Sequence, residues 1–178
     1  CRQGATRLEH VGRWTLMALS VSTAFGELKI NGVSMHTPAW KIHDVVHFWV
    51  DSELRGDYVE IPGQDGEDPV PLRQSSAQIN QRFSMVGDVD QTDAPYAASG
   101  GYSAWAVGFA SNMNYLRTNV LTGRNLTGNR LRAATLQVPG EGSVRTADVH
   151  CWIVPGAINN RYIWQATLSV RIPAGMFV

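Results

Sequence analysis

One stretch of this chain, from Tyr102 to Leu121, is the only long run whose apolar residues recur at helical spacing. Its apolar side chains lie 4, 4, 3 and 4 positions apart, and they are Trp105, Phe109, Met113, Leu116 and Val120. That spacing places them along one face of an α-helix. Most of the remaining chain alternates with the period of two that is typical of strands. One helix among strands predicts a mainly β fold in which other surfaces must cover much of the sheet.

Several segments show the alternation that half-buried strands require. The turn dipeptide Asn31-Gly32 lies between two apolar runs and predicts a hairpin within residues 18–33. In the strand expected over residues 130–138, we expect Arg132 to face outward, away from the apolar side chains. The other long strands are expected within residues 40–50, 70–85, 143–154 and 164–172. Together these elements predict a β-sandwich or partly open barrel with one flanking α-helix.

The length and composition favour one domain that buries surface in an assembly. A chain of 178 residues suits a single domain. We expect residues 1–17 to be an N-terminal extension and residues 18–178 to form that domain. Lys plus Arg and Asp plus Glu are both 15, so the basic excess of a free nucleic-acid binder is missing. Charged residues are only 17% of the chain and Trp occurs 6 times, which favours contact with other subunits over an ordinary large core.

Neither a disulfide nor a helical membrane span is expected. Cys1 is terminal and Cys151 lies in a predicted strand, so a native pairing of the two is not expected. The chain lacks any run of about 18 apolar residues, the length that a membrane-spanning helix needs. We therefore expect no membrane partner.

Two pairs of reactive side chains have simpler structural explanations. On a strand, His43 and His47 would lie about 13 Å apart at ~3.3 Å per residue, too far apart for one metal ion. His150 and Cys151 are adjacent in a predicted strand, so their side chains point to opposite faces and cannot act as a catalytic pair. We expect Cys151 to be a small buried side chain.

The acidic loop offers no better site. Asp88, Asp90 and Asp93 lack the spacing and the bidentate glutamate of an EF-hand calcium loop. A turn capped by its own aspartates explains them more simply. We expect no cofactor, no metal and no enzymatic activity.

Tryptophans and charged loop residues are the better candidates for function. Trp49 and Trp152 fall opposite the main apolar stripes, where an aromatic side chain is either second-layer core or a subunit contact. The helix stripe of Trp105, Phe109, Met113 and Leu116 is expected to pack against the sheet. The candidate subunit-contact residues are Trp40, Trp49, Trp152, Arg55, Asp65 and Asp68.

Three ordered groups of segments resemble a known family. The first group comprises residues 31–33 and 37–40, the second 54–57, 61–63 and Gly66, and the third 86–90, 145–149 and 170–175. Together they resemble the small minor or distal tail proteins of long-tailed phages (siphoviruses) of actinobacteria, over roughly residues 20–178.

The resemblance implies a tail-tube-like fold, with packed sheets and a helix on the flank. It implies a hexameric ring in which the sheets of neighbours join into a closed barrel around a DNA channel, which would leave no exposed strand edges. The implied partners are further copies of the chain, the tail tube protein, and the tail tip and baseplate proteins. DNA would pass through only in transit. The implied location is the virion tail, assembled in the host cytoplasm.

Two other functions fit the same sequence. One is the major tail tube subunit, which stacks in many rings and differs from a tip protein in copy number. The other, from a different class, is a carbohydrate-binding β-sandwich module that stacks sugars on exposed aromatic side chains.

Overall fold

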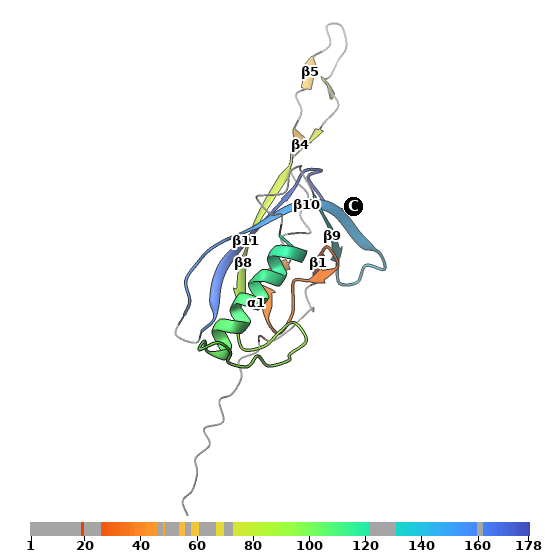
Figure 1. Ribbon diagram of the computed structural model, residues 1–178. Helices are drawn as coiled ribbons and strands as arrows, with labels where there is room; N and C mark the ends of the chain where they lie inside the picture. The colour runs from red at the N-terminus through yellow and green to blue at the C-terminus, as the bar shows by residue number, and fades with distance from the viewer. Residues whose placement is uncertain are drawn as a thin grey trace, which may run out of the picture.

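The computed structural model describes residues 19, 26–45, 48, 54–55, 58–60, 67–69, 73–121, 131–159 and 162–178. Seven strands form one antiparallel sheet, curled into a half-barrel, and one α-helix lies against it (Figure 1). The predicted mainly β, partly open barrel with one flanking helix is therefore confirmed. The expected extension, residues 1–17, lies outside the described residues.

The sheet has the strand order β2-β1-β9-β10-β11-β8-β3. Its strands are β1 (Glu27–Ile30), β2 (Val33–Ser34), β3 (Trp40–Ile42), β8 (Ala77–Met85), β9 (Arg132–Gln137), β10 (Val144–Val154) and β11 (Trp164–Ile172). Four short strands lie between β3 and β8 in the chain: β4 (Leu54–Arg55), β5 (Tyr58–Glu60), β6 (Glu67–Pro69) and β7 (Arg73–Gln74). The helix is α1 (Ala104–Asn119).

The long strand β10 belongs to both halves of the half-barrel. Its first part, Val144–Val149, pairs with β9, and its second part, His150–Val154, pairs with β11. Because the two partners lie on opposite edges of β10, this strand carries the sheet from the β2-β1-β9 half to the β11-β8-β3 half (Figure 1). The register of β10 therefore fixes how the two halves meet.

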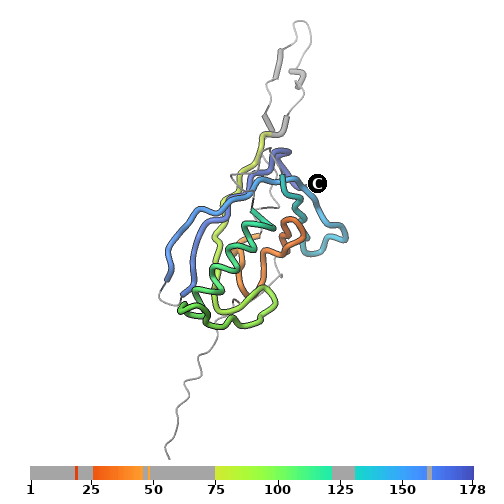
Figure 2. The backbone as a smooth tube through the Cα atoms, in the orientation of Figure 1, coloured from red at the N-terminus to blue at the C-terminus, as the bar shows by residue number. Residues whose placement is uncertain are grey.

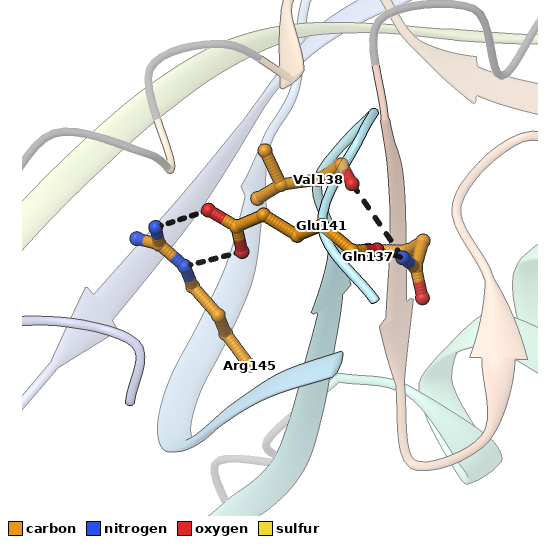
Figure 3. A network of polar contacts seen from close by, with 4 residues as sticks. All are labelled: Gln137, Val138, Glu141 and Arg145. Carbon is orange, nitrogen blue, oxygen red and sulfur yellow. Dashed lines mark hydrogen bonds and ion pairs between the residues drawn. The ribbon is translucent and has the colours of Figure 1, made fainter. Parts of the chain in front are cut away.

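The turn between β9 and β10 is held by side chains on both of its sides (Figure 3). The guanidinium of Arg145 donates to both carboxylate oxygens of Glu141, with an Nε–Oε2 distance of 2.9 Å. The amide of Gln137 donates to the carbonyls of Glu141 and Val138, at 3.0 and 3.5 Å. Bidentate pairing fixes geometry as well as adding energy, so the turn sets the register of β9 against β10.

The core lies between the concave inner face of the sheet and α1. Alternate residues of each long strand point inward and are buried, as the period of two predicts. The outermost strand β3 contributes Trp40, which is 1% exposed. The largest fully buried side chains are Trp40, Phe48, Phe83, Leu28, Ile30, Met35, Ile42, Met85, Leu116, Leu136, Leu168 and Ile172.

The predicted hairpin is present, and one predicted strand is shorter than expected. Asn31 and Gly32 join β1 to β2 with φ values of 52° and 78°, the positive values that a type I′ turn requires. The strand expected over residues 40–50 ends at Ile42, and His47 lies outside the described residues. Val45 and Phe48 are nevertheless buried in the core, because apolar side chains there cover the sheet without joining it.

The helix packs its predicted face against the sheet (Figure 2). Ser103 caps its start by accepting a hydrogen bond from the backbone N–H of Ala106. Leu116 is buried, and Phe109 and Met113 pack against the core. The C-cap residue is Val120, whose backbone N–H donates to the carbonyl of Leu116.

The middle of α1 approaches the segment after β8 at backbone distance. A Cβ on Gly108 would lie 1.9 Å from the carbonyl oxygen of Gly87, and a Cβ on Gly87 would lie 2.1 Å from the carbonyl oxygen of Trp105. Beside this contact, the buried amide of Asn112 donates to the carbonyls of Val86 and Val89 at 3.0 and 2.9 Å. Tyr96 donates its hydroxyl to the Asn112 carbonyl oxygen at 3.0 Å. The helix is therefore fixed by glycine contacts and by a satisfied buried amide.

The end of α1 is anchored by side chains from three strands or their turns. Asn31 donates to the carbonyl of Asn119, and the thiol of the buried Cys151 donates to the carbonyl of Val120. Arg132 donates to the carbonyls of Thr118 and Leu121. The outward orientation predicted for Arg132 is wrong, because it shares the face of Ala134 and Leu136 and reaches the helix end from there. These contacts satisfy the carbonyls that a helix end leaves unpaired.

Replacing Asn112 with alanine should lower the stability of the fold by about 2–3 kcal/mol, because the buried carbonyls of Val86 and Val89 lose their donor. The melting temperature should fall by about 5–10 °C. Differential scanning calorimetry checks this, with Asn114→Ala, at an exposed position of the same helix, as the matched control. Equal melting temperatures for the two variants would contradict the structure.

Replacing Arg132 with methionine keeps the aliphatic stem but removes the donors to the helix end. The free energy of unfolding should fall by about 1–2 kcal/mol. Urea denaturation followed by circular dichroism measures it, and Arg117→Met, an exposed arginine of α1, serves as the control. If the Arg117 variant loses as much stability as the Arg132 variant, the anchoring role is wrong.

Candidate functional site

On the outer side of the β10–β11–β8–β3 half of the sheet, polar side chains surround one tryptophan. We call this surface the outer face. It consists of the side chains that alternate with the core residues on these strands, together with His43, which follows β3. Its members are Lys41, His43, Gln78, Asn80, Arg82, Ser84, His150, Trp152, Val154, Gln165, Thr167, Ser169 and Arg171.

Trp152 stands in a row with two hydrogen-bonding side chains. It lies opposite Ser169 in the β10–β11 register, and Ser169 lies opposite Asn80 in the β11–β8 register. The Ser169 hydroxyl donates to the Asn80 carbonyl oxygen at 2.7 Å. Trp152 is 36% exposed, so its ring is open to a contact from outside the chain. The predicted contact residue Trp152 is therefore placed on the surface.

The outer face concentrates positive charge that the net charge of zero conceals. Lys41, Arg82 and Arg171 lie on it, and neither Asp nor Glu occurs in β3, β8, β11 or His150–Val154. Arg82 and Arg171 are exposed. The sequence does not reveal this patch, because its cations are far apart in the chain and come together only through strand pairing. A surface with cations and no carboxylates attracts anionic groups.

The four short strands β4, β5, β6 and β7, which we call the arm, lie beyond the end of β8 that begins at Ala77 (Figure 1). Its outer ladder pairs β4 with β7, and its inner ladder pairs β5 with β6, so the two ladders are nested as one long hairpin. Of the predicted contact residues, Arg55 lies in β4 and Asp68 in β6, and Asp65 lies outside the described residues.

Trp40 and Trp49 do not join this surface. Trp40 is 1% exposed, and its ring lies 5.8 Å from that of Tyr115 on the helix. Because its side chain fills the chain's own core, we remove Trp40 from the candidate contact residues. Its inward position follows from the alternation that also buries Ile42. Trp49 lies outside the described residues.

Aromatic side chains at the start of α1 lead from the core to the surface. Phe109 meets the Trp164 ring edge-on at 5.5 Å and stacks on Trp105 at 5.0 Å. Trp105 in turn lies 5.9 Å from the ring of Tyr162 and donates its Nε1–H to the Tyr162 carbonyl at 2.8 Å. Tyr162 is 64% exposed and has a φ of 57°, which is uncommon for a residue other than glycine. Trp105 therefore joins the helix face to the β10–β11 connection.

The acidic loop is a capped turn, as predicted. The Asp90 carboxylate accepts hydrogen bonds from the Thr92 hydroxyl and from the backbone N–H groups of Thr92 and Ala94. The Thr92 hydroxyl contributes most to a lowered pKa of Asp90. All three hydrogen bonds end on Oδ1, which therefore serves the turn.

Two histidines near the β2–β3 connection have lowered pKa values. His36 is 8% exposed, and its Nδ1 lacks a hydrogen-bond partner. Burial lowers the pKa of His36, partly offset by a hydrogen bond with the Ile42 backbone and by the charge of Glu27, and Lys41 and His43 add smaller lowering effects. The sequence predicts neither the burial of the His36 ring nor the lack of a hydrogen-bond partner for its Nδ1.

His43 is bonded to the outer face itself. Its Nε2 lies 2.7 Å from the Ser84 hydroxyl. Partial burial lowers the pKa of His43, and the cations Lys41 and Arg82 lower it further, while Asp44 raises it. Burial is therefore the main cause of the lowered pKa of His43, and the two neighbouring cations add to it.

A scan of the chain against protein-family models finds no match, and a search of the curated proteins finds none either. Within the described residues, no helix is long and apolar enough to cross a membrane. In the same part of the chain, no group of three or more His, Cys, Asp and Glu side chains could hold a metal ion.

The stability of the fold should fall as the pH is lowered through the ordinary histidine pKa of 6.5. In this range the unfolded chain gains protons at His36 and His43 that the folded chain resists, so protonation favours unfolding. Urea denaturation over a pH series measures the slope. His36→Gln should flatten it, and adding His43→Gln should flatten it further. A slope unchanged in the double variant would show that other groups cause the effect.

Proposed function

We propose that this chain is a structural subunit of a phage tail. In this proposal it forms a hexameric ring at the distal end of the tail tube, connects the tube to the tail tip and baseplate, and surrounds the DNA channel. The observation that carries the proposal is an open half-barrel with a projecting β arm. Such a sheet has strand edges for neighbours to complete and an arm with which to reach them.

The open edges lie on two strands of the half-barrel. β3 pairs with β8 only over Phe83–Met85, so Ala77–Gln81 has β11 on one side and no described strand on the other. His150–Val154 of β10 likewise pairs with β11 alone among the described strands. Unpaired edges template the addition of further strands, and closing a sheet into a barrel removes them. A ring of copies joined at these edges would have that effect.

The segments that resemble tail proteins include positions with a clear structural task. Asn31-Gly32 forms the I′ turn, and Gly87 makes room for the helix backbone. The segment at the end of β11 runs through Ile172 to Gly175, whose φ is 88°. The resemblance therefore covers residues that this architecture needs, which supports a shared fold.

The same proposal names the partners and the location. Further copies of the chain, the tail tube protein and the tail tip and baseplate proteins would complete the assembly in the host cytoplasm and remain in the virion tail. DNA would contact the ring only in transit, because strong phosphate contacts would slow its passage. The formal net charge of zero agrees with weak contacts.

The chain purified with its tail partners should form closed rings that are visible by negative-stain electron microscopy. Rings are expected because head-to-tail contacts with a closing rotation generate them. Two results would contradict the proposal. One is a tail particle that retains no antibody against this chain after washing, and the other is a mixture that contains only monomers. Quantitative mass spectrometry of purified virions should give the copy number of a single hexameric ring. A copy number in the hundreds would instead identify the major tail tube subunit.

A carbohydrate-binding module is the second candidate, and one observation favours it. Trp152 is exposed in one row with the buried Ser169 and the exposed Asn80, and an aromatic ring near an accessible amide group can hold a sugar ring. Glycan array binding by a monomer, lost in Trp152→Ala without a change in melting temperature, would support this candidate over the ring.

A further inference from the structure

The strand registers place Trp152 between two rows of the outer face that each contain an arginine. Trp152 lies opposite Ser169, and Ser169 lies opposite Asn80, which makes the middle row. Arg171 belongs to the row on one side of it and Arg82 to the row on the other. Neighbouring rows on one face are two residues apart, or about 6.6 Å at ~3.3 Å per residue. The exposed aromatic ring is therefore flanked by a guanidinium group on both sides.

Both arginines lie close enough to reach a ligand that contacts Trp152. Arg171 is a diagonal neighbour of Trp152 across the β10–β11 pair, and such neighbours lie about 7–8 Å apart. Arg82 is one strand further away, at about 12 Å from Trp152 for strands ~4.8 Å apart. Both arginines are exposed, and within the described residues neither forms an ion pair. Arg171 donates to the Ser76 hydroxyl at 3.3 Å, a neutral acceptor that leaves its charge uncompensated.

Amide and hydroxyl groups line the surface between the two arginines. Gln78 and Asn80 are exposed on β8, and on β11 Gln165 is exposed and Thr167 is half-buried. Amides and hydroxyls both donate and accept hydrogen bonds, which is what the hydroxyl groups of a sugar require. The surface around Trp152 therefore offers hydrogen bonds as well as charge.

Two carboxylates limit the positive charge of this region. Asp44 and Asp148 border the outer face, and both are exposed. Asp148 precedes His150 on the same side of β10 and is four residues from Trp152, about 13 Å along the strand. With the histidines neutral, the three cations of the face and these two carboxylates give a formal charge of +1. Such a surface suits a ligand with a few separate negative charges better than a dense polyanion.

The aromatic content of the outer face argues against nucleic acid. Proteins that bind single strands stack successive bases on several aromatic side chains in a basic groove. Among the outer-face side chains that the structure describes, Trp152 is the one Trp, Tyr or Phe. One ring with amides around it and guanidinium groups on two sides is better suited to a sugar chain that carries carboxylates.

We propose that the outer face binds an acidic glycan, a sugar chain built partly of uronic acids. One sugar ring stacks on Trp152, and carboxylate groups of the glycan pair with Arg82 and Arg171. Bidentate pairing with a guanidinium recognises a carboxylate by its shape as well as by its charge. This inference rests on the carbohydrate-binding candidate for the same face and names its ligand class. It does not depend on ring formation in a tail.

Isothermal titration calorimetry of the full chain tests the ligand class with three probes: an oligogalacturonate, a maltooligosaccharide of the same length and a dT oligonucleotide. The oligogalacturonate should bind at least about tenfold more tightly than the neutral maltooligosaccharide, because charge-assisted hydrogen bonds are stronger than neutral ones. Added salt should weaken this binding, since it screens exposed charges.

Substitutions on the outer face test the residues. Arg82→Gln with Arg171→Gln should reduce the affinity for the oligogalacturonate to that for the maltooligosaccharide. Trp152→Ala should lower it by about tenfold or more. Arg117→Gln, at an exposed position of α1, is the matched control and should bind like the wild type.

Melting temperatures from differential scanning calorimetry show whether each variant keeps the fold. If Trp152→Ala does not fold, nuclear magnetic resonance of the wild type replaces it. The indole N–H signal of Trp152 should then shift as oligogalacturonate is added. The signal of Trp105, whose indole N–H is bonded to the Tyr162 carbonyl, should stay in place.

Three results would overturn the proposal. Equal affinity for the acidic and the neutral sugar chains would retain a carbohydrate site but exclude the acidic ligand class. Binding of the dT oligonucleotide alone would assign the face to nucleic acid. Failure of all three probes to bind would exclude the carbohydrate-binding candidate as well. Detection of the chain in purified virions tests the tail function separately from these measurements.

Discussion

The close contact between α1 and the segment after β8 is the constraint on which the rest of the structure depends. Within the described residues one α-helix covers the inner face of the sheet, so its depth and direction decide whether the core is sealed. Backbone contact is possible because residues 87 and 108 are glycines, and Asn112 fixes the helix at that distance. The aromatic contacts at its start and the Arg132 contacts at its end can form only once the helix lies there.

The alternation of apolar and polar residues predicted most strands of the sheet. Contacts made only in the folded chain explain where that prediction was wrong. The strand Trp164–Ile172 has the bounds that its sequence predicts, because it is paired through its length with β8. Arg132 was assigned to the wrong face, since a charged residue is assumed to face water unless something inside can receive it. Here the helix end supplies carbonyl acceptors. No local pattern could reveal that, because α1 and β9 meet only in the folded chain.

The surfaces for function were less predictable than the core. The exposed position of Trp152 follows from its place opposite the apolar stripe, whereas Trp40, also named as a contact candidate, belongs to the apolar stripe of its own strand and is buried. The cations of the outer face come from β3, β8 and β11, which are distant in the sequence. Net charge does not report how charged residues are distributed over the surface. A formal charge of zero is compatible with an even distribution and with separate acidic and basic surfaces.

The sharing of β10 between both halves of the half-barrel also shapes how the chain folds. A slip of one residue along β10 would turn Val149 and Cys151 outward and bring Trp152 inward, with errors in both halves at once. Neither half can adopt a correct register without the other, which couples their formation into one cooperative step. The pairings of β10 are local, since β9 and β11 are its neighbours in the chain, whereas those of β1 with β9 and of β8 with β11 join residues far apart. Closing these distant pairs carries a large loop-closure entropy, and slow, all-or-none folding is its kinetic consequence.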